Sequence, residues 1–493
     1  MRAFSYLSPL ILLLLSMTAG CQPSVNFPAQ ADASAAEAAG AWRAYDANHD
    51  GKTEYFVFTD GGARITRIGY DLTSDGRPDS MIELDSIDAN FARHLVIILD
   101  GVPYTTAKAF YDNGGLRYCH PPSKVISPYP TMTDMSMEDV LGYIPTQAYE
   151  AKYYSRPKNK VVGGWMSYLG GANMPYSDVM EYRTNLFLDV LGYVAPWRVY
   201  RKEINDIKEQ FDKRDSKELV AYIVSSAGIG TNDGEAGQLK MLQYVDRLVS
   251  QVVYETRGLL KVTVLADHGH THTQAKRVPM ESFLKERGWD VSSSLKDPND
   301  VVYIRFGLVT FISFSTHSPA KLAADLTDAT GVEIVSYADG QEVVVLSDDG
   351  GTARIANRDG RFRYTPSAGD PLKLKPILAN LSADAAGTYD ADDLLAATAD
   401  HQYPAPLQRL WRTHFALVGQ PGDVVVSLKD EWYSGAQGFS HFVDVASTHG
   451  GLNRRNSVTF IMTSAGKLPE VMRSRDVPEA LGKLFDRPFP YRR

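Results

Sequence analysis

Val262-Thr-Val-Leu-Ala-Asp267-His268-Gly269-His270 is the stretch on which the fold assignment of this chain depends. Its opening apolar and β-branched residues are typical of a short strand buried in a sheet. Asp267 and His268 follow where that strand ends, and Gly269 allows the backbone to turn there. A carboxylate beside an imidazole suits a divalent cation, although a solvated aspartate next to a hydrogen-bonded histidine would give the same pattern. The remaining segments have to separate these two interpretations.

Other apolar runs share the character of residues 262–266. Each run is continuous instead of alternating, which is expected of strands that are buried on both faces of a sheet. The first of them is followed directly by Asp100-Gly101, just as residues 262–266 are followed by Asp267. The runs are His94–Leu99, Leu219–Val224, Val424–Leu428 and Val458–Met462.

Amphipathic helices alternate with these strands. Residues 238–256 carry an apolar face at helical spacing, and Gly258 is a stop signal after it. The residues on that face are Leu242, Val245, Leu248, Val249, Val252 and Val253. A more polar helix is expected over Glu203–Lys213. The alternation predicts an α/β fold with a mostly parallel central sheet that has helices on both faces. Because ligands collect at the carboxyl ends of such strands, Asp100, Asp267 and His268 are candidate ligand-binding residues.

The composition sets limits on size and partners. The chain has 493 residues, of which 44% are hydrophobic, enough for a large core and more than one domain. A formal charge of −8 and a pI near 5.8 argue against general nucleic-acid binding, since the charge balance implies no basic face. A phosphate-binding site in this chain would have to be formed by a few neighbouring residues instead of by a broad basic surface.

The N-terminus has the features of an export signal. Residues 1–20 begin with Met1-Arg2, continue through an apolar run and end in small residues before Cys21. The run is too short for a membrane span, and the stretch resembles a bacterial lipoprotein signal in which Cys21 is lipidated. We therefore expect a protein anchored at the extracytoplasmic face of a bacterial membrane. Residues 21–40 are expected to be a tether without fixed structure. Cys119 is then the only other cysteine, so no intramolecular disulfide is expected.

Two Asp-rich segments follow and repeat each other. Tyr45-Asp46-Ala-Asn48-His-Asp50-Gly51-Lys-Thr-Glu54 recurs as Tyr70-Asp71-Leu-Thr73-Ser-Asp75-Gly76-Arg-Pro-Asp79. Oxygen side chains fall at loop positions one, three, five and nine, with glycine at six, which is a pattern that wraps Ca²⁺. The expected ligands are Asp46, Asn48, Asp50 and Glu54 in one loop and Asp71, Thr73, Asp75 and Asp79 in the other.

These segments predict a small β unit over residues 41–88. The glutamate at position twelve of an EF-hand is missing, so the loops resemble the short calcium loops of secreted bacterial repeat modules instead. Strands are expected over Tyr55–Phe58 and Ala63–Ile68. The alternative is a pair of metal-free turns in β-hairpins.

The larger domain is expected over residues 89–493, with two stretches that interrupt the alternation of strands and helices. Residues 141–215 are rich in Tyr, Met and Gly, and residues 282–420 contain several short β-rich pieces. Either stretch could cover the site and select its substrate, or be an elaboration of the surface.

Four motifs in order give the chain a specific resemblance. Asp100-Gly101, Tyr129-Pro-Thr131-Met-Thr133, Asp267-His268-Gly269 and Thr448-His449-Gly-Gly451 resemble those of the alkaline phosphatase superfamily, particularly its phosphodiesterase and nucleotide pyrophosphatase branch. The resemblance covers roughly residues 90 to 463 in outline. It implies an alkaline-phosphatase-like fold and a metal-dependent phosphoric ester hydrolase, acting on phosphodiesters or phosphomonoesters.

The resemblance also assigns roles to individual residues. Asp100, Asp267 and His268 would hold one divalent cation, which Thr133 would also touch, and His449 would belong to a second metal. Thr133 would be the nucleophile that forms a covalent phosphoryl-enzyme, because a cation favours the alkoxide form of an otherwise poor nucleophile. Thr131 is the runner-up for that role. A helix over residues 134–140 would instead make Thr133 an N-cap, and both functions are compatible.

The second metal site departs from the pattern of the family. An Asp and a His four residues apart are expected after the strand that precedes the long helix, but Ser225-Ser-Ala-Gly-Ile-Gly-Thr231 stands there. Aligning the Asp position to Ser226 or to Ala227 puts Gly230 or Thr231 at the His position. Three explanations are open: Asp233, Glu235, His270 or His272 rebuild the site, a single cation suffices for some ester, or hydrolysis is lost while binding remains. For His270 and His272, a solvated loop is the expected state.

The favoured function is therefore a lipid-anchored hydrolase of phosphate esters. The mixed histidine and carboxylate ligands favour Zn²⁺ in the active site, with Mn²⁺ next, besides Ca²⁺ in the N-terminal loops. The alternative from another class is a noncatalytic metal- and ligand-binding lipoprotein that retains the phosphatase fold.

Overall fold

The computed structural model describes residues 29–30, 42–47, 50–61, 64–164, 167, 174–435 and 445–491. The expected signal over residues 1–20, Cys21, most of the expected tether and Asn48 lie outside these ranges. No helix among the described residues has the length and hydropathy that are needed to cross a membrane.

The central sheet has six strands and confirms the α/β class. Its strands β10, β6 and β11 form a parallel group, and β23 is parallel to β7. β22 lies between β11 and β7 and is antiparallel to both, so it alone runs in the opposite direction. In spatial order the strands are β10 (Glu218–Ile223), β6 (Arg93–Leu99), β11 (Leu260–Ala266), β22 (Val458–Thr463), β7 (Ser123–Ile126) and β23 (Val471–Arg473).

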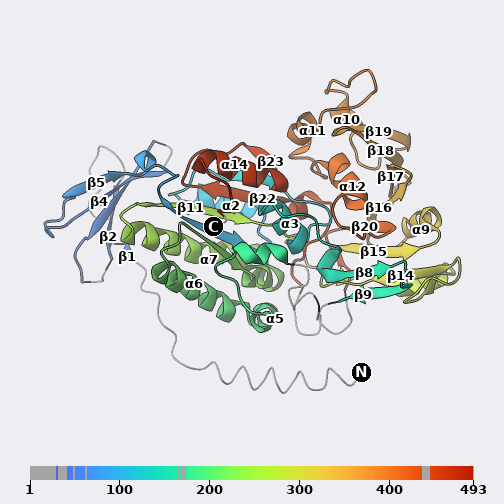
Figure 1. Cartoon of the computed structure of the whole chain (residues 1–493), viewed down its shortest axis with the longest axis horizontal. Coiled ribbons are helices and arrows are strands. Elements are labelled where there is room, and N and C mark those ends of the chain that lie inside the picture. The colour runs from blue at the N-terminus through green and yellow to red at the C-terminus, as the bar shows by residue number, and fades with distance from the viewer. Residues whose placement is uncertain are drawn as a thin grey trace, which may run out of the picture.

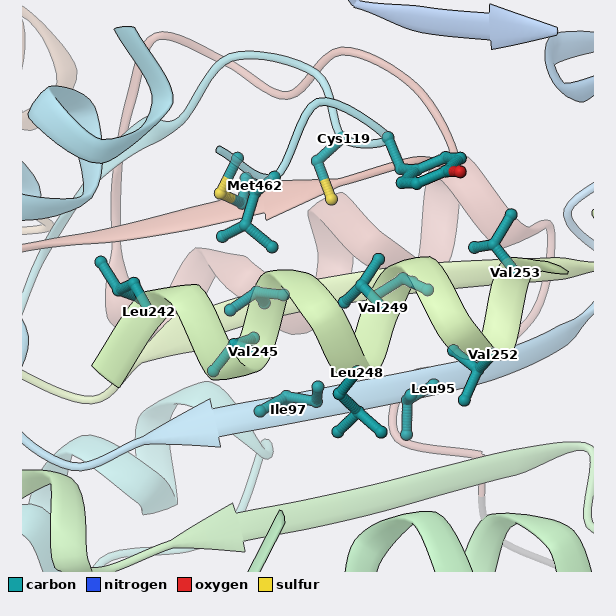
Figure 2. Packing of buried hydrophobic residues seen from close by; sticks show 14 of the residues in the cluster. Leu95, Ile97, Cys119, Leu242, Val245, Leu248, Val249, Val252, Val253 and Met462 are labelled. Carbon is teal, nitrogen blue, oxygen red and sulfur yellow. The ribbon is translucent and has the colours of Figure 1, made fainter. Parts of the chain in front are cut away.

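Both faces of this sheet are buried, as the continuous apolar runs predict. Leu95, Ile97 and Leu99 of β6 belong to the hydrophobic cluster that includes helices α6 (Pro196–Lys213) and α7 (Ser225–Glu255). Val96 and Ile98, which alternate with them, belong to the cluster that includes α3 (Thr133–Val140) and α14 (Val477–Phe485). Figure 2 shows Leu242, Val245, Leu248, Val249, Val252 and Val253 of α7 gathered around Leu95, Ile97, Cys119 and Met462. Cys119 is buried there as a free thiol.

Helix α7 begins earlier than the sequence predicts. Its start is Ser225 instead of Gln238, and a non-helical residue, Gly234, divides it with φ of 59° and ψ of −147°. Glycine adopts this backbone conformation without the steric penalty of a side chain, so two helical segments continue across it. The stretch Ser225–Thr231 is therefore part of this helix and is buried. Nothing in the sequence indicated this, because these residues show no apolar periodicity.

A second, eight-stranded sheet is formed by strands that lie between residues 290 and 428. All of its pairs are antiparallel except β13 with β14. The run Val424–Leu428 was expected in the central sheet, and this expectation is wrong, because it pairs with β15 and β16 as β20 in the second sheet. The strands in spatial order are β13 (Asp290–Val291), β14 (Asp300–Ile304), β15 (Phe311–Thr316), β20 (Val424–Leu428), β16 (Val332–Asp339), β17 (Glu342–Ser347), β18 (Thr352–Arg358) and β19 (Arg361–Ala368).

Helices cover both faces of this second sheet too (Figure 1). One buried cluster contains residues of α8 (Met280–Glu286) and α9 (Pro319–Leu326). Another contains residues of α10 (Lys375–Leu378), α11 (Ala391–Thr398) and α12 (Pro406–Phe415), together with Met132 and Met135 from the start of α3. The second sheet therefore packs next to the region that was expected to carry the nucleophile.

Shorter elements connect these units. Between residues 141 and 215 lie η2 (Tyr149–Ala151), the hairpin β8 (Lys152–Ser155) and β9 (Lys160–Gly163), η3 (Pro175–Val179), α5 (Leu186–Val194) and α6. The others are α2 (Tyr104–Asp112), β12 (Lys276–Arg277), β21 (Trp432–Tyr433), α13 (Arg454–Ser457) and η5 (Ser474–Asp476).

The N-terminal β unit forms a five-stranded antiparallel sheet at one end of the molecule (Figure 1, blue). It docks on the end of α7, where the Tyr55 ring stacks on Tyr254 with 4.5 Å between centroids and the Tyr70 hydroxyl donates to Tyr254 O at 2.8 Å. Ala29 and Gln30 pair with β2, so the expected tether has structure at these two residues. Its elements are β1 (Ala29–Gln30), β2 (Trp42–Asp46), β3 (Tyr55–Thr59), β4 (Ile65–Tyr70), β5 (Ser80–Glu83) and η1 (Leu84–Ser86).

Candidate metal centre and active site

Asp100 and Asp267 lie side by side at the carboxyl edge of the central sheet. Asp100 follows β6 and Asp267 follows β11, and the register pairs Leu99 with Ala266, the residues just before them. Asp267 Oδ1 accepts hydrogen bonds from the backbone N–H of Gly101 at 2.9 Å and of His268 at 2.8 Å. Asp100 Oδ2 accepts a hydrogen bond from the Tyr222 hydroxyl at 2.5 Å. Each carboxylate is therefore held by one oxygen and has its other oxygen available.

The two available oxygens converge with His268. Asp100 Oδ1 and Asp267 Oδ2 are each 3.5 Å from His268 Nε2, and neither oxygen has a hydrogen-bond partner among the described residues. His268 Nδ1 lies 2.9 Å from Gly269 O, which only accepts, so Nδ1 carries the proton and Nε2 presents a lone pair. Because buried polar atoms rarely go without a partner, three converging lone pairs fit a divalent cation. The donor set of Asp100, Asp267 and His268 fits the metal that the sequence implies.

Burial shifts the acid–base behaviour of all three groups. It raises the pKa of Asp100 well above its ordinary value, and the neighbouring Asp267 carboxylate raises it further. Burial raises the pKa of Asp267 to about 6 and lowers that of His268 to about 4. The protein alone therefore stabilises the charged carboxylate pair poorly. A bound cation would reverse this balance, because its own charge is the largest in the site.

Gly269 serves a different purpose from the turn that the sequence suggested. Its φ is not in the positive range that only glycine adopts easily. A Cβ at this position would lie 1.9 Å from Arg455 O, and its N–H donates to Asn456 O at 2.9 Å. Glycine is needed here because the backbone of α13 approaches closely, which fixes the loop that carries His268.

The structure distinguishes the two candidate threonines. Thr133 is the first residue of α3, is partly exposed, and has its Oγ1 3.4 Å from His268 Nε2. The N-cap of α3 is Met132, so the hydroxyl of Thr133 is not a cap. Thr131 is fully buried, and its Oγ1 accepts a hydrogen bond from the Gly450 N–H at 2.8 Å. Thr131 thus holds the loop of residues 449–451, while Thr133 borders the candidate cation site.

His449 reaches the same place from the loop before β22. Its ring stacks on that of His268, with 4.1 Å between centroids, and its Nδ1 donates to Thr131 O at 2.9 Å. Its carbonyl accepts from the Thr310 N–H, next to β15, at 2.7 Å. The loop is therefore positioned by α3 on one side and by the second sheet on the other.

The stretch Ser225–Thr231 contributes no carboxylate or imidazole to the site. Ser226 Oγ instead lies 2.7 Å from Asp100 N and 2.9 Å from Asp100 O, which ties α7 to the end of β6. His270, for which a solvated loop was expected, is fully buried, and His272 is half-buried with its Nε2 2.9 Å from Gln238 Oε1. The expectation of a solvated pair is wrong because the loop runs between β6, α7 and the 445–450 segment.

Several residues at the site were not identified from the sequence. Tyr222 belongs to β10 and orients Asp100, while Ser127 Oγ donates to Asp267 O at 2.7 Å. Ser447 Oγ accepts from the His272 N–H at 2.7 Å. The only signal for Tyr222 was its place near the end of a buried strand, and a lone serine carries no signal at all.

The described residues of the two Asp-rich loops make matching hydrogen bonds. The carboxylate of Asp46 accepts from the N–H groups of Asp50 and Gly51 at 3.2 and 2.8 Å. Asp71 accepts in the same way from Asp75 and Gly76 at 3.2 and 2.7 Å. Side-chain oxygens of Asp46, Asp50 and Glu54 lie within 4.8 Å of one another and could hold a metal ion. Glu54 also accepts from the Ala47 N–H, and Asp79 from the N–H groups of Leu72 and Thr73.

Fold and site together define an α/β protein with a candidate divalent-cation site at the carboxyl edge of a mostly parallel sheet. Solved structures to which this chain is similar include the human and murine ectonucleotide pyrophosphatase/phosphodiesterase 5. Each is 11% identical to this chain and covers 80% of it and 95% of its own length, with TM-scores of 0.43 and 0.42 respectively. Phosphonoacetate hydrolase from Sinorhizobium meliloti 1021, in complex with phosphonoformate, is 14% identical, with a TM-score of 0.42 over 83% of this chain and 97% of its own.

These neighbours belong to the alkaline phosphatase superfamily, the group that the motifs of this sequence resemble. No family model matches the chain, and no curated protein matches it. At such low identity a shared arrangement of elements does not transfer a substrate, so the function has to be argued from the side chains of this chain.

Proposed function

We propose that this protein is a metal-dependent phosphoric ester hydrolase, acting on a phosphodiester or a phosphomonoester with Thr133 as its nucleophile. One observation carries the proposal. Two buried carboxylate oxygens, which have no hydrogen-bond partner in the described part of the chain, converge with the lone pair of His268 beside the hydroxyl of Thr133. The same arrangement supports Zn²⁺ as the preferred cation, since a mixed set of imidazole and carboxylate suits it, with Mn²⁺ second.

Different residues of the site would bind the cation, orient its ligands and bind the phosphate. A divalent cation held by Asp100, Asp267 and His268 would favour the alkoxide of Thr133 and offset the charge of the phosphoryl oxygens. Tyr222 and the N–H of Gly101 hold the carboxylates in place. Thr133 stands at the N-terminus of α3, where the first backbone N–H groups of a helix have no partner within the helix and attract phosphate.

The proposed reaction is an in-line displacement in two steps. Thr133 Oγ1 loses its proton to solvent and forms a bond to phosphorus while the ester P–O bond breaks, and the leaving alcohol takes up a proton from solvent. Water then attacks the phosphothreonine, releases the phosphate product and restores the hydroxyl. Thr133 is partly exposed, so both substrate and water can reach it.

The test combines metal content with hydrolysis of aryl phosphate monoesters and diesters. The wild-type protein is expected to bind Zn²⁺ and to hydrolyse at least one of these classes. Thr133→Ala should lower kcat/KM by about 10³-fold or more, since it removes the nucleophile. Thr133→Ser, which keeps a hydroxyl, should retain most of the activity. Wild-type rates in Thr133→Ala would remove this residue from the mechanism.

A result without hydrolysis would favour the alternative function. Zinc binding that depends on Asp267, together with no turnover of any ester or with any metal, would indicate a noncatalytic binding lipoprotein. The Ser225–Thr231 stretch, which lacks the ligands of a second metal, is the feature that supports this alternative.

We further propose that the two N-terminal loops bind Ca²⁺. The oxygen pattern of the sequence and the matching hydrogen bonds of the two loops support this proposal. Calcium should raise the melting temperature of the wild-type protein, and the increase should be smaller in a variant with both Asp46→Asn and Asp71→Asn. Equal melting temperatures in calcium and in chelator would contradict the proposal.

We also propose that the protein is exported and anchored through a lipid on Cys21, which would place it at the extracytoplasmic face of a bacterial membrane. The support is the sequence of residues 1–21. Expression in a bacterium should place the wild-type chain in the membrane fraction and Cys21→Ser in the soluble extracytoplasmic fraction. Identical fractionation of the two chains would contradict the anchor.

A further inference from the structure

His270 is a buried imidazole with one nitrogen unused. Its side chain is fully buried, and its Nδ1 lies 2.6 Å from Ser447 Oγ. Its Nε2 has no hydrogen-bond partner among the described residues. The Ser447 hydroxyl accepts from the His272 N–H and has Thr271 Oγ1 at 3.3 Å as a partner for its own proton. We assign His270 Nδ1 as a second donor to this hydroxyl, which leaves a lone pair on Nε2. A buried lone pair without a partner is costly unless a ligand satisfies it.

The ring of His270, which carries this Nε2 atom, lies beside the ring of His449. The two ring centroids are 5.6 Å apart, with 47° between the ring planes. Two imidazoles on one tetrahedral zinc, with Zn–N bonds of about 2.0–2.1 Å, have centroids about 5 Å apart, close to this spacing. The Nδ1 of His449 is occupied by Thr131 O, so its Nε2 is also the nitrogen that remains for a ligand. His449 is partly exposed, which gives the pair access to solvent.

Gly101 makes room for the His270 ring, and Gly230 makes room for the amide of the neighbouring Gln238. A Cβ on Gly101 would lie 2.7 Å from His270 Cδ2 and 3.3 Å from its Nε2. A Cβ on Gly230 would lie 3.6 Å from His270 Cδ2 and 2.5 Å from the amide nitrogen of Gln238. The imidazole therefore fills the space between the end of β6 and the start of α7. No side chain from Ser225–Thr231 supplies a carboxylate or an imidazole to that space.

We propose that His270 and His449 together bind a second divalent cation beside the one on Asp100, Asp267 and His268. With two protein ligands the second position is weaker than the first, and water or phosphoryl oxygens of the substrate complete its coordination. The inference rests on the proposed function for the first cation. The rings of His268 and His449 stack 4.1 Å apart, and two-metal phosphatase sites have their ions about 3.5–4 Å apart.

The other residues considered for a second site have different partners. Asp233 accepts from Trp197 Nε1 at 2.6 Å on the exposed side of α7. Glu235 is exposed, and its Oε1 lies 3.4 Å from Thr106 Oγ1. The Nε2 of His272 lies against Gln238 Oε1. His272 is therefore the matched control, a histidine of the same loop whose outer nitrogen is already occupied.

The test is zinc stoichiometry by equilibrium dialysis and elemental mass spectrometry on the full mature chain without a histidine tag. The wild-type protein should bind two zinc ions per chain, one of them more weakly. His270→Ala and His449→Ala should each bind one, and the double variant should also bind one. His272→Ala should still bind two. Circular dichroism checks that each variant is folded, and His270→Gln replaces His270→Ala if the smaller side chain prevents folding.

The outcomes separate this inference from the proposed function. Two ions in both the wild type and His270→Ala would overturn the assignment of His270. One ion in the wild type that is lost in Asp267→Asn, with no change in His270→Ala, would overturn the second site and leave the first intact. No zinc in the wild-type chain would overturn both.

Discussion

Single residues at the carboxyl edge of the central sheet explain why a cation fits there. Asp100 and Asp267 each use one oxygen within the protein and present the other, and His268 is oriented by the carbonyl of Gly269. Groups that hydrogen-bond to a metal ligand, and so fix its orientation, contribute strongly to metal affinity. Tyr222 has this role for Asp100, so it is the residue whose loss should weaken the site without removing a ligand.

Tyr222→Phe should lower zinc affinity by about 10- to 100-fold while the fold is retained. The physical reason is that Asp100 Oδ2 loses its hydrogen bond, so the carboxylate is less well oriented. Competition with a chromophoric chelator measures the change. Tyr303→Phe is the control, since it also removes a tyrosine hydroxyl hydrogen bond, to Ser434 at 2.7 Å, but in the second sheet. Equal affinities in Tyr222→Phe and wild type would contradict the role of Tyr222.

Asp100→Asn should stabilise the protein in chelator and destabilise it in zinc relative to wild type. Without a cation the substitution removes a buried carboxyl group whose charged form is disfavoured by burial and by Asp267, which should raise the free energy of unfolding by about 1–2 kcal/mol at pH 8. With zinc the variant lacks a ligand and loses the stabilisation that binding gives the wild type. Urea unfolding in both conditions measures the effect, with Asp112→Asn, at an exposed position of α2, as the control. A variant less stable than wild type in chelator would contradict the prediction.

At the scale of elements, the packing of α6 against the start of α7 determines where the long helix begins. Glu203 of α6 is fully buried and accepts from the N–H of Val224 at 3.0 Å and of Ser225 at 3.3 Å. It also accepts from the Ser225 hydroxyl. Burial raises the pKa of Glu203 to about 8, although these hydrogen bonds favour the charged form.

This carboxyl makes stability depend on pH. Between about 4.5 and 8 the folded state binds a proton that the unfolded state has released, so the free energy of unfolding falls as pH rises through that range. Glu203→Gln should remove this component, which is on the order of a few kcal/mol, and flatten the profile of urea midpoint against pH. Glu209→Gln, an exposed position of the same helix, should keep the wild-type slope. Parallel profiles for Glu203→Gln and wild type would contradict the assignment.

At the scale of the whole molecule, the N-terminal sheet and the second sheet lie on opposite sides of the central sheet (Figure 1). The second sheet positions the His449 loop through Thr310, and the N-terminal sheet packs on the far end of α7. The N-terminal strands share a buried cluster with β6 and α7, because Tyr55, Val57 and Ile68 belong to it. The N-terminal unit is therefore expected to be stabilised by the larger domain.

Tyr254→Ala should loosen the N-terminal sheet and leave the metal site unchanged. The substitution removes the ring that stacks on Tyr55 and Tyr70. Truncating a fully buried aromatic side chain lowers the free energy of unfolding by about 3–5 kcal/mol, and the loss is smaller here because Tyr254 is partly exposed. Limited proteolysis should then cleave residues 64–90 faster, with zinc content as in the wild type. Leu72→Ala, at an exposed position of the same unit, should not change the cleavage rate. Equal cleavage of Tyr254→Ala and wild type would contradict the docking role.

The sequence by itself determined much of the central architecture. Continuous apolar runs predicted β6, β10, β11 and β22, because strands buried on both faces need no polar alternation. The helical spacing of the apolar residues in 238–256 predicted the apolar face of α7, because residues three and four apart lie on the same side of a helix. The placement of Asp100 and Asp267 directly after two such strands also indicated that they would meet, as the register of β6 and β11 brings about.

Only the tertiary structure decided the features that depend on contacts distant along the chain. Neither the assignment of β20 to the second sheet nor the early start of α7 has a local signal, because each is set by its packing partners. Tyr222 faces Asp100 through the pairing of β10 with β6, and His270 fits where it is buried because Gly101 leaves space for its ring. Local patterns show which side chains reach the end of a strand, whereas the packing of separate strands and helices determines which of them have an unsatisfied atom to offer a ligand.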